Sequence, residues 1–150
     1  AILRSFSKAY GLAALRLGGI YAPAEAAGLL HRLREPFNVS APAEAAGLAA
    51  LGDDAHLAKV VAHTRTWRAR LARELTALGF EVHVGEGNFL VLRLQARGPR
   101  SAARARAALQ RGGVLVRALE GYGLPACLRI TIGSAAANRA VVRALKPLAA

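Results

Sequence analysis

The sequence predicts an α/β protein in two parts: a small sheet covered by helices, and a different, incomplete layer joined to it by a long helix. Three observations lead to this fold class. The segments after Gly79 read β-β-α-β-β-α, an apolar stripe of helical period precedes them, and two short apolar segments begin the chain. With 150 residues, 54% of them hydrophobic, the chain is long enough to bury one core.

The first third of the chain predicts two strands and a helix. The strands are Ala1–Phe6, which we expect to be buried, and Leu17–Tyr21. Pro23 opens a helix that runs to about Arg34, because proline is tolerated at the first helical position and Glu25 lies in the positive first turn.

Residues 42–78 predict one long helix, or two with a break at Gly52-Asp53-Asp54. The second half repeats apolar side chains at helical spacing. This stripe consists of Leu57, Val60, Thr64, Trp67, Leu71, Leu75 and Leu78. Gly79 follows the stripe, and glycine is the usual residue just beyond a helix end.

The last part of the chain predicts four strands and two helices. The strands are Glu81–Val84, Asn88–Leu94, Val114–Arg117 and Leu128–Ile132. One helix is expected from about Ser101 to Gln110, and a closing helix begins near Ser134. The segment Gly121-Tyr122-Gly123-Leu124-Pro125 reads as a turn between the last two strands.

The charge is uneven along the chain. Lysine and arginine number 21 against 9 acidic residues, for a net charge of +12, and residues 61–150 carry 15 of the basic and 4 of the acidic side chains. Such a charge raises a basic nucleic-acid-binding module as an alternative from another functional class. Against it, the arginines are spread along helical segments and aromatic residues, at 5%, are not interleaved with them, so no stacking platform for bases is visible.

Other classes are excluded by what the sequence contains. The single cysteine, Cys127, excludes a disulfide scaffold and a cysteine-ligated zinc site, and it suits a reducing compartment. No apolar run approaches the roughly 18 residues that span a bilayer, and no signal-peptide layout opens the chain, so a cytoplasmic location is expected. His56 and His63 are seven residues apart with no third ligand near them, so no metal site is expected.

The densest group of polar residues is Ser5-Phe6-Ser7-Lys8-Ala9-Tyr10-Gly11, followed by Arg16. Two hydroxyls, an ammonium, a guanidinium and loop amides can converge on a dianionic phosphate. A lysine at the end of an apolar strand can also lose hydration, which favours its neutral amine as a nucleophile toward an aldehyde. The alternative is a surface lysine beside serines that cap a turn. A P-loop is excluded, because GxxxxGK[ST] is absent.

Ser5 to Gly18 resembles the pyridoxal-phosphate lysine motif of the fold-type I aminotransferases, and within them it is most similar to the histidinol-phosphate aminotransferase branch. Further segments match the same family in order along nearly the whole chain. They are Pro36-Phe37-Asn38-Val39-Ser40, Asn88-Phe89, Val114-Leu115-Val116-Arg117, Gly121-Tyr122-Gly123-Leu124-Pro125 and Leu128-Arg129-Ile130-Thr131-Ile132-Gly133. One departure is Ala14, which stands where the motif usually has glycine.

The resemblance implies a role for six residues. Lys8 would be the catalytic residue and would bind pyridoxal 5'-phosphate covalently. Ser5, Ser7 and Arg16 would hold the phosphate of this cofactor. Two residues would bind the substrates, Arg129 through a carboxylate and Arg117 through the phosphate of histidinol phosphate. The implied reaction exchanges an amino group between histidinol phosphate and 2-oxoglutarate, in histidine biosynthesis.

The resemblance also implies a domain organisation and an assembly. Residues 1–35 would end the large cofactor-binding domain, 36–78 would form an interdomain helical segment, and 79–150 would form the small domain. The chain would then be the last two-fifths of a homodimeric enzyme, inactive alone, without nucleic-acid or membrane partners. An aromatic amino acid aminotransferase and a threonine-phosphate decarboxylase of the same fold remain alternatives.

Overall fold

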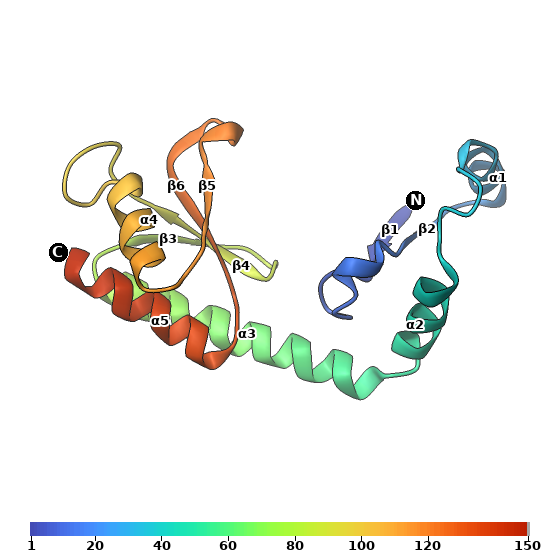
Figure 1. Cartoon of the computed structure of the whole chain (residues 1–150), viewed down its shortest axis with the longest axis horizontal. Coiled ribbons are helices and arrows are strands. Elements are labelled where there is room, and N and C mark those ends of the chain that lie inside the picture. Colours follow the sequence, from blue (N-terminus) through green and yellow to red (C-terminus); the bar gives the residue numbers. More distant parts are fainter. Residues whose placement is uncertain (150) are drawn as a thin grey trace. The chain divides into compact units, whose positions relative to one another are not determined.

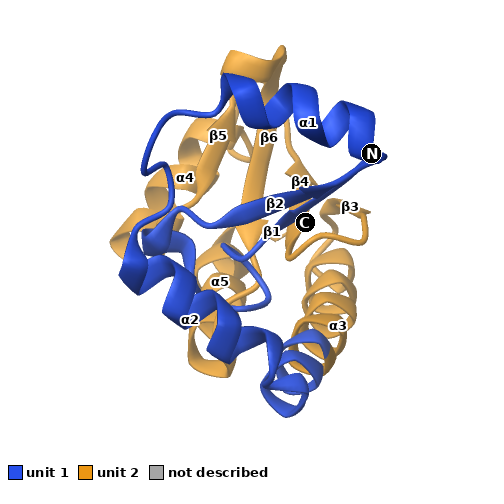
Figure 2. Cartoon of the chain, turned by 90° about the vertical axis from the view of Figure 1, so that its right-hand side faces the viewer, with its two compact units in different colours: residues 1–61 blue, residues 62–150 orange. Residues whose placement is uncertain are grey.

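The computed structural model describes residues 1–149 and divides the chain into two compact units, residues 1–61 (unit 1) and residues 62–150 (unit 2) (Figures 1 and 2). The boundary falls inside helix α3 (Asp54–Ala77), which contributes its start to unit 1 and the remainder to unit 2. Within residues 1–149, no helix combines the length and the apolarity needed to cross a membrane.

Unit 1 consists of a two-stranded antiparallel sheet and two further helices (Figure 1). Strand β1 (Ile2–Ser5) is followed by a single 3₁₀ turn, η1 (Ala13–Leu15), and by strand β2 (Gly18–Tyr21). Helices α1 (Ala24–Leu33) and α2 (Ala41–Leu51) come next. These elements confirm the two predicted strands and the predicted helix after Pro23, which is the N-cap of α1.

The expectation that the first strand is buried is wrong. All residues of β1 and β2 are exposed, and the described residues of unit 1 include only two buried ones, Ala43 and Gly47 of α2. The reason is geometric, because two short strands expose both faces unless another layer packs on them. An apolar sequence therefore identified the strands correctly but not their surroundings.

The helical part of the chain is broken where the sequence indicated. Gly52 closes α2 by donating its backbone N–H to the carbonyl of Ala49, and the Asp53 carboxylate accepts from the backbone N–H of His56, 2.9 Å away. All seven residues of the predicted stripe on α3 are buried or half-buried. The helix ends at Ala77, and just beyond it the φ of +76° at Gly79 lets the N–H of Phe80 reach the carbonyl of Leu75, as expected for a glycine that stops a helix.

Unit 2 is a four-stranded antiparallel sheet with helices against it, in strand order β3-β4-β6-β5 (Figure 1). Its remaining elements are β3 (Glu81–Val84), β4 (Phe89–Arg93), α4 (Ala102–Arg111), β5 (Arg117–Leu119), the 3₁₀ turn η2 (Glu120–Tyr122), β6 (Leu124–Thr131), α5 (Ala135–Leu145) and the 3₁₀ turn η3 (Lys146–Leu148). The predicted order β-β-α-β-β-α is confirmed.

Two predicted strand boundaries are wrong. Strand β5 begins at Arg117 instead of Val114, because the backbone of Val114 still closes helix α4 by donating to the carbonyl of Leu109. Strand β6 begins at Leu124, inside the predicted turn. Pro125 is tolerated there because the β5–β6 register is irregular between Ala118 and Leu119, so its missing N–H breaks no regular ladder.

The two faces of the unit 2 sheet have different roles. One face packs against α3, α4 and α5 and forms the core with side chains that include Leu90, Leu92, Leu128 and Ile130. Since side chains alternate along a strand, the register places the intervening residues on the second face, which we call the arginine face. It carries Glu81, His83, Phe89, Val91, Arg93, Arg117, Arg129 and Thr131.

Candidate active site

The lysine loop, residues 7–16, is closed by the β1–β2 hairpin. The register pairs Ser5 with Gly18, and one further hydrogen bond, from the N–H of Phe6 to the carbonyl of Leu17 at 3.1 Å, continues the pairing. Beyond this bond, the next residues along the chain are Ser7 on one side and Arg16 on the other. The backbone pairing of the hairpin therefore places Ser5, Ser7 and Arg16, the predicted phosphate ligands, at the base of the loop, and Lys8 follows Ser7.

Hydrogen bonds and one aromatic pair fix the loop. The N–H of Gly11, at a φ of +73°, reaches the carbonyl of Lys8 at 3.0 Å, and the N–H of Leu12 reaches that of Phe6 at 3.0 Å. The rings of Phe6 and Tyr10 stack with their centroids 4.7 Å apart. The path of the chain around Lys8 is thus set mainly by local turn geometry.

Arg16 has the left-handed backbone conformation, with a φ of +54°. This conformation costs a non-glycine residue about 1–3 kcal/mol and is found most often where the surrounding structure requires it, as at binding sites. The side chain is held in place by a 2.8 Å hydrogen bond from Nη1 to the carbonyl of Ala13. Since the guanidinium has five N–H donors, the remaining ones can bind an anion.

The donors at the base of the loop suit a dianionic phosphate. Ser5 Oγ accepts a hydrogen bond from the N–H of Ser7 at 3.1 Å, which leaves its own proton free to donate. Ser7 adds a second hydroxyl and Arg16 a charge. Lys8 itself is exposed, so the loss of hydration expected from the sequence is not provided by the described residues.

The second group of predicted site residues lies on the arginine face of unit 2. Arg117 of β5 and Arg129 of β6 are direct cross-strand partners in the antiparallel register. Their side chains therefore leave the same face at neighbouring positions. Like charges in this arrangement repel each other, and an anion bound by both would remove the repulsion.

Arg129 has an unusual environment for a charged side chain. It is half-buried on a strand whose neighbouring residues, Leu128 and Ile130, belong to the core. Its guanidinium lies over the ring of Phe89, 5.3 Å from the centroid. Its Nε is buried and finds no hydrogen-bond partner among residues 1–149. A buried N–H without an acceptor is costly, and a bound carboxylate would provide that acceptor.

In addition to these arginines, the structure points to residues for which the sequence suggested no role. Arg117 donates from Nη2 to the hydroxyl of Tyr122 at 2.9 Å. After β6, the buried Asn138 holds both the N–H and the carbonyl of Gly133, at 2.9 and 3.0 Å, and His63 Nε2 lies 2.9 Å from the same carbonyl. The contacts of Arg117 with Tyr122 and of Gly133 with Asn138 each join residues five positions apart, whereas His63 and Gly133 are 70 positions apart. Only the contact between Arg117 and Tyr122, across a predicted turn, could have been suspected from the sequence.

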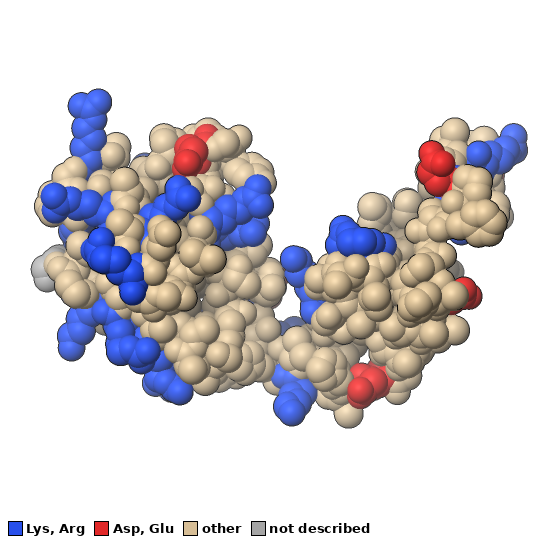
Figure 3. All heavy atoms as spheres, in the orientation of Figure 1, with Lys and Arg blue, Asp and Glu red and all other residues tan. Residues whose placement is uncertain are grey.

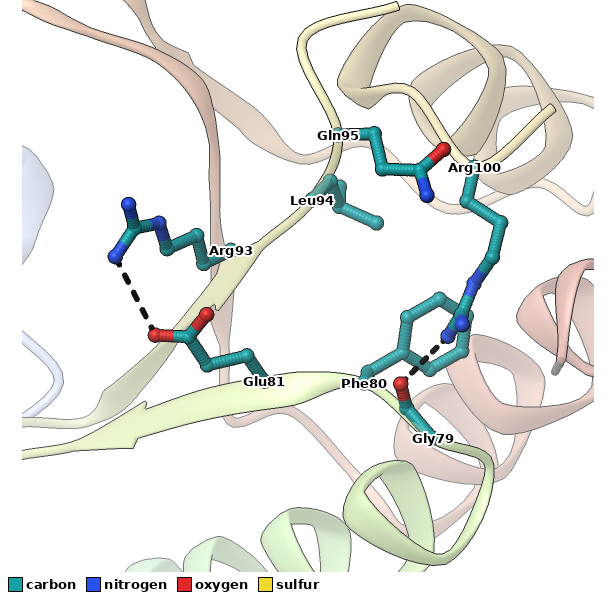
Figure 4. A pocket seen from close by; sticks show the side chains of 7 residues that line it. All are labelled: Gly79, Phe80, Glu81, Arg93, Leu94, Gln95 and Arg100. Atoms are coloured by element: carbon teal, nitrogen blue, oxygen red, sulfur yellow. Dashed lines mark hydrogen bonds and ion pairs between the residues drawn. The ribbon is translucent and has the colours of Figure 1, made fainter. Parts of the chain in front are cut away.

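A hollow of about 200 Å³ near the end of β4 is a weaker candidate for an anion site (Figure 4). Two arginines line it, but both are already engaged. Arg93 lies 3.5 Å from the carboxylate of Glu81, and Arg100 donates to the carbonyl of Gly79 at 2.6 Å and stacks on Phe80. Among residues 1–149, the structure groups no three His, Cys, Asp or Glu side chains suited to a metal ion.

Three comparisons identify the family. The protein-family model "Aminotransferase class I and II" matches residues 1–145. Histidinol-phosphate aminotransferases of Rhodopseudomonas palustris (strain BisB18) and Paramagnetospirillum magneticum are 45% and 46% identical over 144 and 145 residues. These matches cover 96% and 97% of this chain. The chain spans about 40% of the length of these curated relatives.

Solved structures agree with this assignment. Histidinol-phosphate aminotransferases from Clostridium acetobutylicum (TM-score 0.86, 25% identity) and from Sinorhizobium meliloti in complex with pyridoxal-5'-phosphate (TM-score 0.81, 28% identity) each match 97% of this chain. The matches cover 44% and 40% of those chains. An L-threonine-O-3-phosphate decarboxylase from Porphyromonas gingivalis matches with a TM-score of 0.75 and 29% identity, over 97% of this chain and 45% of that one.

The elements of both units thus have counterparts in fold-type I aminotransferases, and the family match runs from the lysine loop through the strand that carries Arg129. On this agreement of sequence and fold, the chain belongs to the aminotransferase class I and II family.

Proposed function

We propose that this chain is the C-terminal two-fifths of a pyridoxal-phosphate-dependent histidinol-phosphate aminotransferase of histidine biosynthesis. One observation carries the proposal: eight curated proteins named histidinol-phosphate aminotransferase are 43–46% identical to it over 95–97% of its length. The proposed reaction moves an amino group between histidinol phosphate and 2-oxoglutarate.

The donors of the lysine loop fit pyridoxal phosphate. The free proton of Ser5 Oγ, the hydroxyl of Ser7 and the unengaged N–H groups of Arg16 together match the acceptor oxygens of a phosphate. When bound, the cofactor supplies an electron sink that makes the substrate Cα–H bond easier to break. The S. meliloti relative was solved in complex with this cofactor.

Lys8 would perform the proton transfer. It is the one lysine in the loop, and the loop's turn bonds keep its backbone fixed beside the phosphate donors. Its Nζ would take the proton that leaves the substrate Cα and return a proton in the reverse direction. The loop would contribute to catalysis by holding Lys8 in position, because a proton transfer requires donor and acceptor atoms within hydrogen-bond reach.

The arginine face would bind the substrates. Arg129, whose buried Nε finds no acceptor among residues 1–149, suits the carboxylate of glutamate. Arg117, exposed beside it, suits the phosphate of histidinol phosphate. The two arginines would therefore bind the two anionic groups from neighbouring positions on the same face of the sheet.

Steady-state kinetics of the complete enzyme test this proposal. Arg117→Ala should raise the KM for histidinol phosphate about ten- to a hundredfold, the range expected for one lost charge-assisted bond to an anion, and should affect glutamate less. Arg129→Ala should slow the glutamate half-reaction. Arg97→Ala is the matched control, since Arg97 is an exposed arginine outside the strands. If histidinol phosphate gives no turnover while another amino donor does, the substrate assignment is wrong.

The likeness to the threonine-phosphate decarboxylase supports a second candidate, decarboxylation of a phosphorylated amino acid by the same fold. Release of CO₂ from threonine phosphate, without transfer of its amino group, would favour it. An aromatic amino acid aminotransferase would instead turn over phosphorylated and unphosphorylated donors alike. A nucleic-acid-binding module would bind with an affinity that falls steeply with salt and would take up no cofactor.

A cytoplasmic homodimer with its active site at the subunit boundary is the proposed assembly. The exposed apolar side chains of unit 1, Leu3 and Leu33 among them at 74% and 82% exposure, support a surface that is covered in the complete enzyme. Sedimentation of the complete enzyme as a monomer at micromolar concentration would contradict it.

A further inference from the structure

The β5–β6 hairpin returns Tyr122 onto Arg117. The strands are joined by η2, and the positive φ of Gly123, +76°, lets its N–H bond to the carbonyl of Glu120 at 3.0 Å. This tight turn brings the phenol within 2.9 Å of Arg117 Nη2, with the guanidinium 5.3 Å from the ring centroid. Arg117 is thus held both by a hydrogen bond and by the face of an aromatic ring.

We propose that Tyr122 positions Arg117 and shares with it the binding of the substrate phosphate. The inference rests on the proposed function, because it concerns the residue assigned to that phosphate. Since the phenol oxygen accepts from Arg117, its own proton is free to donate to a phosphate oxygen. The pair then offers an anion one charged and one neutral donor, joined to each other.

Electrostatics on the arginine face explain why Arg117 requires positioning. Arg129 lies directly opposite on β6 and repels it. An exposed arginine side chain is long and flexible, and the repulsion would direct it toward solvent. The contact with Tyr122 restrains it before substrate arrives, so less conformational freedom is lost on binding.

Kinetics of four forms of the complete enzyme test the inference: wild type, Tyr122→Phe, Arg117→Ala and the double variant. Phenylalanine keeps the ring and removes only the hydroxyl. We expect Tyr122→Phe to raise the KM for histidinol phosphate about five- to tenfold, where tenfold corresponds to about 1.4 kcal/mol, with kcat unchanged. The kcat and KM for unphosphorylated histidinol should stay within about twofold, and the double variant should be no worse than Arg117→Ala, as expected for residues that act together.

Each contrary result overturns the inference, and the Arg117→Ala data show which assumption failed. If Arg117→Ala weakens histidinol phosphate selectively but Tyr122→Phe does not, Tyr122 has no part in phosphate binding and the proposed function stands. If Tyr122→Phe slows both substrates equally, or lowers the midpoint of thermal unfolding, its role is structural. If Arg117→Ala itself does not distinguish the two substrates, the phosphate role fails for both residues.

Discussion

Unit 2 buries thirteen residues in one cluster between its sheet and its helices, whereas the described part of unit 1 buries only Ala43 and Gly47. Exposed large hydrophobic side chains show the reverse distribution, with eleven in unit 1 and four in unit 2. Charge is divided as well. Unit 2 carries fifteen of the basic and four of the acidic residues, and Figure 3 shows Lys and Arg side chains gathered over it.

This difference shows that the two groups of candidate site residues are held in place by different means. Backbone hydrogen bonds and turns fix the loop of Lys8, on a unit with little internal burial. A buried core fixes the strand of Arg129, because Leu128 and Ile130 on either side of it are 1% exposed. The first group should therefore be sensitive to what surrounds unit 1, and the second should not.

The largest expected effect concerns folding in isolation. A polypeptide of residues 62–150 should unfold cooperatively in urea, because its core lies entirely within unit 2. A polypeptide of residues 1–61 should show no cooperative transition by circular dichroism, because it buries too little apolar surface to offset chain entropy. A sharp transition in residues 1–61 would contradict the comparison.

The next largest expected effect is the loss of stability when a large apolar side chain is truncated in each unit. Leu75 of α3 is fully buried, so Leu75→Ala should lower the free energy of unfolding by about 2–5 kcal/mol. Leu33→Ala is the matched control in unit 1, where the side chain is 82% exposed, and should change it by less than about 0.5 kcal/mol. Urea unfolding of the chain provides both values. Equal losses would mean that the burial difference has no energetic consequence.

The arginines of unit 2 should differ in how much they stabilise the fold, because some make buried contacts and others are exposed to solvent. The Arg68 side chain is only 11% exposed, and it donates to the carbonyl of Gly87 and to the carboxylate of Glu86 at 2.9 and 3.0 Å. Arg68→Ala should therefore cost about 1–3 kcal/mol of unfolding free energy. Arg65 is exposed one turn earlier on the same helix, and Arg65→Ala should cost almost nothing. If both variants unfold at the same urea concentration, the Arg68 contacts contribute no stability.

Element type and order could be predicted from the sequence, as could the buried stripe of α3, but the exposure of the first strand could not. The stripe from Leu57 to Leu78 and the stop at Gly79 follow from local periodicity and backbone conformation, and both are confirmed. The β5 boundary was missed because Val114 favours a strand by composition while its N–H closes the preceding helix. The exposure of β1 depends on which other layers pack on it, and no local pattern records that.

The candidate site shows the same division. The hairpin that gathers Ser5, Ser7 and Arg16 is short, so sequence spacing was enough to group them with the loop lysine. The sequence also predicted a turn at residues 121–125 between the strands of Arg117 and Arg129, and the register shows that these two arginines are cross-strand neighbours. The roles assigned to all of these residues stay predictions.

The smallest expected effect involves helix caps. Ser134 Oγ accepts from the N–H of Ala137 at 3.2 Å at the start of α5, and Ser40 Oγ does the same for Ala43 at 3.3 Å at the start of α2. Ser134→Ala should lower the unfolding free energy of unit 2 by about 1 kcal/mol. Ser40→Ala should leave that transition unchanged, because α2 lies in unit 1. A shift of the same size from Ser40→Ala would show that the units unfold together.

We propose that Lys8 carries the cofactor in the complete enzyme, and borohydride reduction followed by peptide mapping can identify the lysine that does so. Reduction fixes pyridoxal phosphate to the amine that carries it, and this chain has only three lysines, Lys8, Lys59 and Lys146. The pyridoxyl group is expected on the peptide that contains Lys8, with no label there in a Lys8→Ala variant. A label on Lys59 or Lys146 in the wild-type enzyme, with Lys8 unmodified, would contradict it.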